Sequence, residues 1–347
     1  MMIKRWILAV LVLGACVGDV DELQLGEETS ELRTSDWTGQ AWVGSDLQQA
    51  YYGGAVATVN GTTYMVHSGA TSPGDLWWTK LGPNGWQDDI RIPNQQASSR
   101  VSLAAFNGEL FMVHSGSDAS SNQVWVSSFD EQSQTWVPND QVSYQSKGTP
   151  AICAFNGYLY FVGVTPSTNQ LWMGKMNASH AFTPQHPLSA QYSASPVSLA
   201  VYQNKLYMAH RAGTTFSVVF NSYDGSSWGL DHNIFDGTGT PIRAVEPAIA
   251  AHDGYLHLVH ITGVGSSGTY VYWTYFDGTV WSVETTIGSM TSATQDPRIT
   301  EGGTGLVMLT TTAVNNPWGT LDTRDLFWAE YKTPIIIISR TATRDRD

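Results

Sequence analysis

Short apolar runs alternate with polar turn sequences along most of the chain. One representative stretch has apolar runs at residues 102–106, 110–114, 124–129 and 135–137, and Asn107-Gly108 separates the first two. Runs of β-branched and aromatic residues bounded by Asn-Gly or Asp-Gly predict strands joined in hairpins, because these dipeptides tolerate the positive φ of tight turns. After residue 36 no stretch has the period of an amphipathic helix. The pattern therefore predicts an all-β fold.

The same pattern occurs five times with a nearly constant spacing. The turn residues Asn60, Asn107, Asn156, Asn204 and Asp253 are separated by 47, 49, 48 and 49 residues. A fixed period of this length is the sequence signature of a repeat architecture. Each unit holds four apolar runs, which is typical of a β-propeller blade built from four antiparallel strands.

A sixth unit opens at Asp296 and lacks its last strand. Residues 37–43 supply a matching strand, because they agree with residues 276–282 at the end of the fifth unit, aromatic for aromatic. We expect this N-terminal strand to complete the last blade and to pair two strand edges that would otherwise stay open. The sequence thus predicts a six-bladed β-propeller over residues 36–333 and leaves residues 334–347 unassigned.

Composition narrows the possible functions. The chain has 347 residues, of which 12% are aromatic and only 14% charged, as expected for a sheet-rich protein outside the cytoplasm. Its formal net charge is −13 and it has no basic patch, so we expect no nucleic-acid partner. No short His or Cys spacing suits a metal ion, and we expect neither a metal nor a cofactor.

The N-terminus has the features of an export signal. Lys4 and Arg5 precede an apolar run, and Leu13-Gly14-Ala15-Cys16 is similar to a bacterial lipobox. This resemblance implies a signal peptide over residues 1–15, a lipid on Cys16 that anchors the protein to a membrane, and delivery to the outer membrane or cell surface. Residues 16–35 are acidic and polar and predict a flexible tether. An ordinary signal peptide with an incidental cysteine, followed by free secretion, remains the alternative.

Three kinds of residue recur at matching places near one edge of the predicted ring. Histidines end the second strand, aromatic residues open the third strand, and polar residues precede the first strand. The candidate sugar-binding residues are His67, His114, His210 and His260, then Trp77, Trp125, Trp172 and Tyr272, and finally Arg100, Thr149, Ser195, Glu246 and Asp296.

An aromatic ring beside imidazoles, hydroxyls and carboxylates is a suitable constellation for a sugar. The C–H face of a pyranose packs on an indole through dispersion, while its hydroxyls need fixed donors and acceptors. Repetition would let several weak sites act together. The aromatic residues could instead pack blade against blade, and the histidines could bond the backbone, which would fit a propeller that only binds other proteins. A second aromatic column, Trp86, Trp136, Phe182, Trp228 and Trp281, is expected to be core.

The repeat resembles the bacterial PLL-like β-propeller lectins. The likeness rests on an Asn-Gly or Asp-Gly turn, Leu-Tyr-x-x-His, Leu-Trp-Trp-Thr or Tyr-Trp-Thr, and Phe-Asp-Gly-x-x-Trp, found best in units one, two, four and five. It implies binding of fucose or related, including methylated, sugars in pockets between blades. Those lectins are typically seven-bladed, and units three and six lack the histidine. A more distant likeness is to six-bladed fungal fucose lectins, whose Arg and Glu sugar ligands do not recur here.

A sialidase, which is also six-bladed, is the competing interpretation. Ile90-Arg91-Ile92-Pro93 looks like the Arg-Ile-Pro signature of that family, and the segment from Ser222 to Trp228 is similar to an Asp-box. Arg91 falls in a fourth strand instead of at the start of the fold, and a glycosidase needs paired acids on one face, for which only Glu246 and Asp296 qualify. We therefore expect a multivalent glycan-binding protein without enzymatic activity.

Overall fold

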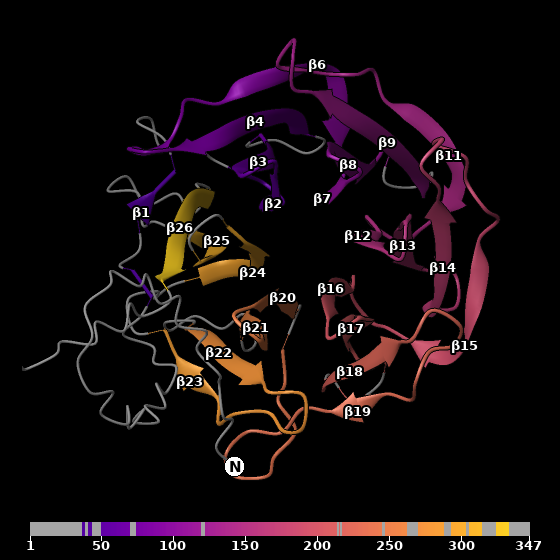
Figure 1. Cartoon of the computed structure of the whole chain (residues 1–347), viewed down its shortest axis with the longest axis vertical. Helices are drawn as coiled ribbons and strands as arrows, with labels where there is room; N and C mark the ends of the chain where they lie inside the picture. Colours follow the sequence, from indigo (N-terminus) through magenta and orange to yellow (C-terminus); the bar gives the residue numbers. More distant parts are fainter. Residues whose placement is uncertain are drawn as a thin grey trace, which may run out of the picture.

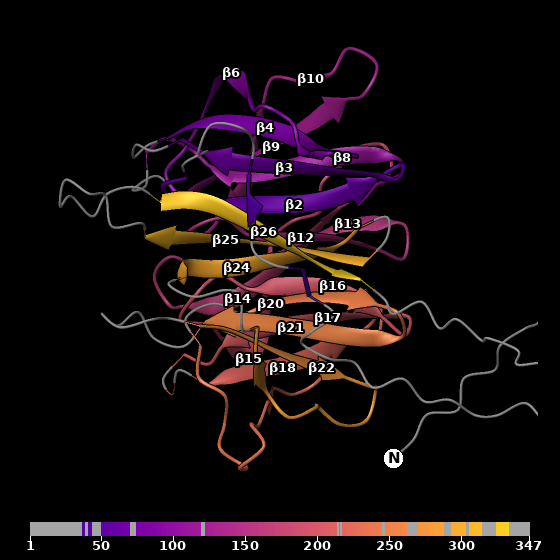
Figure 2. The same ribbon diagram turned by 90° about the vertical axis from the view of Figure 1, so that its left-hand side faces the viewer.

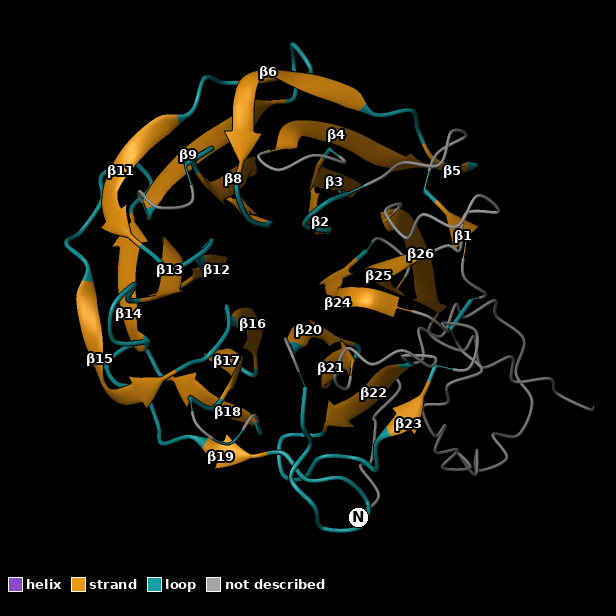
Figure 3. Cartoon of the chain, turned by 180° about the vertical axis from the view of Figure 1, so that it is seen from behind, coloured by secondary structure: helices purple, strands orange, loops and turns teal. Residues whose placement is uncertain are grey.

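The computed structural model describes residues 37–38, 41–43, 50–69, 74–118, 122–213, 215, 217–244, 247–261, 270–287, 293–302, 305–313 and 324–332. These residues form strands and connecting loops, and no helix occurs among them (Figure 3). The expected signal peptide, lipidated Cys16, acidic tether and C-terminal tail all lie outside the described residues.

The strands form six antiparallel sheets. Blade 1 contains β2 (Gly54–Val59), β3 (Thr62–Ser68), β4 (Gly74–Gly82), β5 (Gly85–Trp86) and β6 (Ile90–Ala97). Blade 2 contains β7 (Val101–Phe106), β8 (Glu109–Ser115), β9 (Gln123–Asp130), β10 (Thr135–Trp136) and β11 (Asp140–Gln145). Blade 3 contains β12 (Ala151–Phe155), β13 (Tyr158–Val164), β14 (Gln170–Met176) and β15 (His186–Tyr192).

The second half of the ring repeats this order. Blade 4 contains β16 (Ser198–Tyr202), β17 (Lys205–Arg211), β18 (Val218–Tyr223) and β19 (His232–Asn233). Blade 5 contains β20 (Ala248–His252), β21 (Tyr255–Ile261), β22 (Val271–Phe276) and β23 (Thr285–Thr286). Blade 6 contains β24 (Ala293–Glu301), β25 (Gly305–Ala313), β26 (Arg324–Lys332) and β1 (Ala41–Trp42).

The six sheets surround one axis, so the predicted six-bladed β-propeller is confirmed (Figure 1). The first strand of every blade lies innermost, and β6, β11 and β15 run along the outer circumference (Figure 3). Seen from the side, the strands cross the thickness of the ring (Figure 2). Because the blades radiate from the axis, residues of the first strand are separated from residues of the third by two inter-strand spacings, about 10 Å.

The turns between first and second strands have the conformation that their sequences predict. Asn60 has φ 48° and Gly61 has φ 78°, and the later turns at Asn107, Asn156 and Asp253 have φ values of 51°, 45° and 49°. Positive φ at both central residues is the geometry of tight hairpin turns, and it explains the recurring Asn-Gly and Asp-Gly pairs.

The ring closes through its first strand. Ala41 and Trp42 of β1 pair with Trp328 and Phe327 of β26, and Trp37 forms a further bridge to Tyr331. The Trp37 ring is 6% exposed and lies 5.5 Å, centroid to centroid, from the ring of Tyr331. The N-terminal strand therefore completes blade 6, as the matched spacing of aromatic residues predicted.

Neighbouring blades pack face to face, which fixes the direction of each side chain. On one face of β4, Leu76 and Trp78 are buried in a cluster with Met112 and Phe129 of blade 2. Trp77 belongs to the opposite face, because successive side chains of a strand alternate. The second aromatic column is core at Trp86 and Trp136, as expected. The expectation is wrong for Phe182, which is 36% exposed, and Trp228 and Trp281 are only half-buried.

The outer edge of blades 1 and 2 differs from the expected four-strand pattern. The apolar runs at residues 85–86 and 135–137 form only the very short strands β5 and β10. The longer strands β6 and β11 pair with β4 and β9 and take the outermost position. Within these two strands the buried apolar residues are only Ile92, Ala97, Val142 and Tyr144. Because β6 and β11 contain few apolar residues, the pattern of apolar runs did not predict them as strands.

Candidate functional site

The histidine column and the aromatic column meet as directly opposed residues of neighbouring strands. His67 pairs with Trp77, His114 with Trp125, and His260 with Tyr272. In the remaining described blades the pairing is Gly163 with Trp172, His210 with Val219, and Thr310 with Phe327. The structure thus brings together the imidazoles and aromatic rings that the repeat pattern aligned.

The four histidines lie inside the blades. His67 and His114 are 1% exposed, and His210 and His260 are 0% exposed. At this depth the imidazoles have no surface to offer a ligand, so the expected direct hydrogen bonds from them to a sugar find no support in the geometry. Their contacts are with the protein instead.

Each imidazole reaches a polar side chain that precedes the outer strand of its own blade. The Nε2 atom of His67 lies 3.1 Å from Asp89 Oδ2, that of His210 lies 3.2 Å from Asp231 Oδ1, and that of His260 lies 2.7 Å from Glu284 Oε2. In blade 2 the partner is an amide, and Asn139 Nδ2 lies 3.2 Å from His114 Nε2. The histidines therefore tie the second strand to the outer edge of the blade.

A signal for these partners exists in the sequence and was missed. Each one follows the aromatic residue of the second column by three positions, and the pairs are Trp86 with Asp89, Trp136 with Asn139, Trp228 with Asp231, and Trp281 with Glu284. The third unit has Phe182 and Gln185 at these places and no histidine, which matches the loss of the contact.

The His114 contacts define a neutral imidazole. Nδ1 donates to the Ser115 carbonyl oxygen at 2.9 Å, and Nε2 accepts from the Asn139 amide. Burial disfavours the charged ring and lowers the pKa of His114 from 6.5 to about 4, against a smaller opposing effect of the bond to Ser115.

The aromatic partners differ in exposure, and this separates candidate binding rings from core rings. Trp77, Trp125 and Tyr272 are half-buried, whereas Trp172 is only 1% exposed. A Cβ atom at Gly163 would lie 2.5 Å from Trp172 Cζ2, so in blade 3 the indole occupies the space beside the missing imidazole. Trp172, one of the predicted sugar-binding residues, is therefore a core residue.

Polar side chains surround the half-buried Trp77. Arg91 is its cross-strand partner on β6, and its Nε donates to Asp75 Oδ2 at 2.9 Å. Gln96, opposite Asp75, donates to Asp75 Oδ1 at 2.8 Å. An indole face, a guanidinium, a carboxylate and an amide thus share one surface of blade 1.

The other two rings have simpler surroundings. Trp125 has the exposed Gln141 as its cross-strand partner on β11. Tyr272 stacks on His260 with ring centroids 5.4 Å apart and an interplanar angle of 14°, and exposed Thr286 is its partner on the other side.

These rings belong to the blade faces that are turned towards the preceding blade. Phe129, on the same face of β9 as Trp125, packs with Trp78 and Ile92 of blade 1. Phe276, on the same face of β22 as Tyr272, packs with Tyr207 of blade 4. The half-buried rings therefore lie at the junctions between blades.

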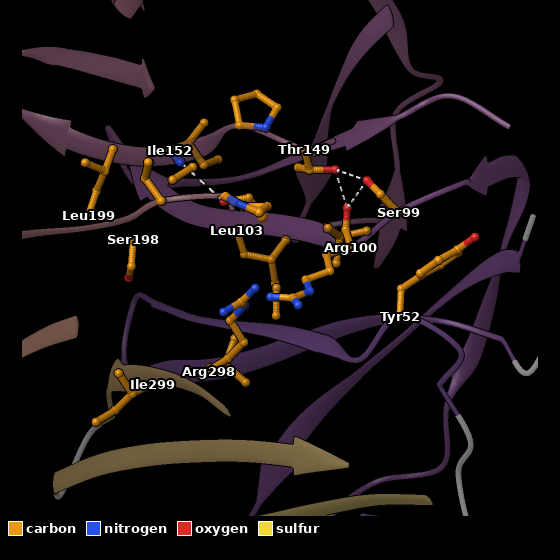
Figure 4. A pocket seen from close by; sticks show the side chains of 18 of the residues that line it. Tyr52, Ser99, Arg100, Leu103, Thr149, Ile152, Ser198, Leu199, Arg298 and Ile299 are labelled. Atoms are coloured by element: carbon orange, nitrogen blue, oxygen red, sulfur yellow. Dashed lines mark hydrogen bonds between the residues drawn. The ribbon is translucent and has the colours of Figure 1, made fainter. Parts of the chain in front are cut away.

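The polar residues before the first strands do not lie at the same site as the aromatic rings. Arg100 and Thr149 line a cavity on the axis of the propeller, and none of the predicted histidines or aromatic residues lines it (Figure 4). We expected all three columns at one site. This is wrong for Arg100 and Thr149, because the first strand is innermost and the third lies two strands farther out.

Thr149 and Ser195 are buried and serve the framework. Thr149 donates its hydroxyl proton to the Arg100 carbonyl oxygen and accepts from the Ser115 N–H at 3.2 Å. Ser195 Oγ donates to the Pro196 carbonyl oxygen at 3.4 Å. Glu246 lies outside the described residues, and Asp296 is described only by its backbone position in β24.

The two sialidase-like segments occupy the periphery. Arg91 lies on the outermost strand of blade 1 and is not among the residues that line the axial cavity. Asp224 organises a tight turn, in which its Oδ1 accepts from the N–H groups of Ser226 and Ser227 at 2.8 and 2.9 Å. These bonds lower the pKa of Asp224 to about 2.

Two further properties concern the described part of the chain alone. Within it, no three His, Cys, Asp or Glu side chains are grouped closely enough to hold a metal ion. None of its segments is a helix with the length and apolar character needed to cross a membrane.

Neither a protein-family model nor a curated protein matches the sequence. Several solved structures share the fold. A protein of unknown function from Dyadobacter fermentans has a TM-score of 0.62 and 10% identity, and the match covers 86% of this chain and all of that one. AofleA from Arthrobotrys oligospora has a TM-score of 0.59 and 11% identity, with 86% and 89% of the two chains covered.

A third similar structure is the sialidase of Trypanosoma rangeli in complex with the inhibitor DANA, with a TM-score of 0.57 and 9% identity. The match covers 82% of this chain and 55% of the sialidase. Glycoside hydrolases are thus among the structural neighbours, and this finding corrects the expectation that the chain has no enzymatic activity. Identities this low show a common fold and transfer no catalytic residue.

Proposed function

We propose that the propeller binds glycans through aromatic rings at the junctions between its blades. The observation that carries the proposal is the state of Trp77, Trp125 and Tyr272, which are half-buried and each lie opposite a buried histidine. A ring held on one side and open on the other is suited to stacking against a sugar, because little rotamer freedom is lost on binding.

Blade 1 offers the most complete site. The Trp77 indole supplies the stacking surface, and Asp75, Arg91 and Gln96 supply acceptors and donors on the same face. Carbohydrate hydroxyls are donors and acceptors at once, so a carboxylate beside a guanidinium can engage neighbouring hydroxyls of one ring. The resemblance to PLL-like lectins favours fucose or a related, including methylated, sugar as the ligand.

Blade 2 and blade 5 would add weaker sites at Trp125 and Tyr272. Blade 3 would have none, because Trp172 is buried. Several equivalent sites on one rigid ring would raise the affinity for surfaces that display many copies of a glycan.

A glycan array followed by substitution of the aromatic rings tests the proposal. Trp77→Ala and Trp125→Ala should each weaken glycan binding by about 1–3 kcal/mol per site, in line with stacking on aromatic residues in other ligand sites, and should leave the fold intact. Trp78→Ala is the matched control, because Trp78 is adjacent in sequence but 4% exposed on the opposite face, and its loss should destabilise the protein.

Other results would count against the proposal. Unfolding of both Trp77→Ala and Trp125→Ala would return these rings to the core, and unchanged glycan binding by the folded variants would favour a propeller that binds proteins. Analysis of the array sugars after incubation adds a separate readout, since release of monosaccharides would assign a hydrolytic activity.

A further inference from the structure

Three large apolar side chains are exposed where blade 4 meets blade 5. Phe235 follows β19, Val280 lies in the turn after β22, and Val283 precedes β23. The loop after β19 comes close to blade 5 here, because a Cβ atom at Gly237 would lie 2.7 Å from Val283 Cγ1 (Figure 3). We refer to Phe235, Val280 and Val283 as the blade 4–5 patch.

The patch is a local feature and does not belong to the repeat. Val283 stands two residues after the second aromatic column, and the equivalent residues of blades 1 to 3 are Asp88, Pro138 and Pro184. The position of Val280, directly before that column, holds Gly85, Thr135, Ala181 and Ser227 in the earlier blades. Apolar surface that gathers at one place within a polar rim is typical of an interaction site. We therefore expect another segment to cover the patch.

The C-terminal segment has the composition of such a cover. Its residues 335–338 are four consecutive isoleucines, which lie outside the described residues and outside the six repeat units. β-Branched side chains favour an extended backbone, and burial of a run this apolar against another apolar surface is favourable in water. Arg340 and Arg344 follow the isoleucines. Because Asp236 and Asp277 begin the turns beside the patch, the segment and the patch also complement each other in charge.

The last described strand, β26, ends close to blade 5. The ring of Tyr331, next to the end of β26, lies 5.7 Å from the Trp273 ring of β22, centroid to centroid. β22 and β26 are both third strands and run in the same direction, so the turn that holds Val280 lies at the edge of the ring where β26 ends.

The segment is long enough to reach the patch from there. Extended backbone spans about 3.3 Å per residue, so residues 333–338 can extend over about 20 Å. Sheets that pack face to face are about 10 Å apart, and blade 5 is the direct neighbour of blade 6. The reach of the segment therefore exceeds the spacing that it has to cross.

We propose that residues 335–338 pack on the blade 4–5 patch and cover it. In an extended segment successive side chains point to opposite sides, so two of the four isoleucines contact the patch. Arg340 and Arg344 then approach the acidic turns at Asp236 and Asp277. The contact is intramolecular and does not depend on the glycan sites proposed above.

Limited digestion of the purified full chain with trypsin tests the proposal, and intact mass measures cleavage after Arg340. A docked segment is cut only when it opens, so the cleavage rate reports the population of the open form. Val283→Asp disrupts the patch, and the double variant Ile336→Asp/Ile337→Asp disrupts both sides of the segment. Each should accelerate cleavage after Arg340 by about tenfold or more.

Val137→Asp is the matched control, because Val137 is an exposed valine next to the second aromatic column of blade 2. It should change the cleavage rate by less than about twofold. Val280→Asp takes the place of Val283→Asp if that variant fails to fold, and the isoleucine variant leaves every described residue unchanged.

Three results would overturn the proposal. The first is cleavage of the wild-type protein as fast as that of the Asp variants of the patch and the segment, which would mean that the segment does not dock. The second is equal acceleration by Val137→Asp, which would remove the specificity for the patch. The third is a dimer in sedimentation velocity that Val283→Asp converts to a monomer, because a second copy of the chain would then cover the patch.

Discussion

His67 Nε2 and Asp89 Oδ2 lie 3.1 Å apart, and the bond between them joins the second strand of blade 1 to the segment that leads into its outermost strand. The imidazole is 1% exposed and stands directly opposite Trp77. The contact therefore fixes the backbone on both sides of the indole. The same arrangement in blade 5, with His260, Glu284 and Tyr272, indicates that it is a property of the repeat.

Removal of the Asp89 carboxylate should lower the stability of the protein, because it leaves the buried His67 without its partner. Asp89→Ala leaves the Nε2 atom of His67 without its partner inside the blade, and we expect a loss of about 1–3 kcal/mol in the free energy of unfolding. Asp140→Ala, at an exposed position of β11, is the matched control and should stay within about 0.5 kcal/mol of the wild type. Urea denaturation measures both, and equal stability of the two variants would show that the His67 contact contributes nothing.

Trp37 should be a main determinant of ring closure. Its side chain is 6% exposed and contacts the rings of Trp273 and Tyr331. Trp37→Ala is expected to cost about 3–5 kcal/mol, whereas Val283→Ala, at a position that is 64% exposed, should cost little. Chemical denaturation compares them, and a Trp37→Ala protein as stable as the Val283→Ala protein would contradict closure through this strand.

Stability should fall in mildly acidic solution because of two buried neutral histidines. Burial lowers the pKa of His114 to about 4 and that of His257 to about 3, from 6.5 in each case. The unfolded chain binds protons below pH 6.5 that the folded chain does not, so the free energy of unfolding decreases as the pH falls from 6.5 towards 4.

The expected slope is about 1.4 kcal/mol per pH unit for each histidine. Unfolding measurements between pH 7 and pH 4 test it, and His114→Gln should reduce the slope because glutamine does not titrate. The carboxylate of Asp224, with a pKa lowered to about 2, loses its contribution only below its unfolded value of 3.8, so the two effects occupy different pH ranges. A stability that is constant from pH 6.5 to 4 would argue against neutral buried rings.

Blade 3 should resist even a small side chain at Gly163. An added Cβ would lie 2.5 Å from Trp172 Cζ2 and 2.7 Å from Ser146 Oγ. Gly163→Ala should therefore destabilise the protein by about 1–3 kcal/mol through overpacking. Gly229→Ala provides the control, because its Cβ would meet Ser222 O at an ordinary distance of 3.5 Å. Thermal melts that place both variants together would mean that the Trp172 indole moves aside freely.

The lipobox-like segment makes Cys16 the proposed membrane anchor. Cys16→Ser should move the protein from the detergent phase to the aqueous phase, because a serine hydroxyl cannot take the place of the lipidated thiol. Partitioning of the wild-type protein and the variant, both expressed in a bacterium that processes lipoproteins, measures this. A serine variant that remains in the detergent phase would show a different anchor.

The repeat pattern predicted the architecture because it depends on local rules. Asn60-Gly61 predicts its own turn, and the spacing of Trp37 and Trp42 predicts which blade they complete. The opposed positions of His67 and Trp77 also follow from counting along two strands. The sequence pattern does not show how deeply a side chain is buried. Residues of one column look alike in sequence whether they are half-buried, as Trp77 is, or fully buried, as Trp172 is.

Contacts between residues of different strands or blades could not be predicted from the sequence pattern either. Asp89 is 22 residues from His67 and attracts no attention without the bond between them. Arg100 and Arg298 line one cavity because closure of the ring places blades 2 and 6 on either side of blade 1, and the repeat pattern does not show this proximity.

The pairing of β1 with β26 also orders events during synthesis. Ala41 leaves the ribosome early, but its partner Trp328 is made almost 290 residues later. Blade 6 can therefore be completed only when nearly the whole propeller exists, and contacts of such long sequence separation form slowly. Chains whose translation stops before residue 324 should accumulate with an unpaired N-terminal strand, and such nascent chains are the form of this protein in which assembly with the wrong partner is most to be expected.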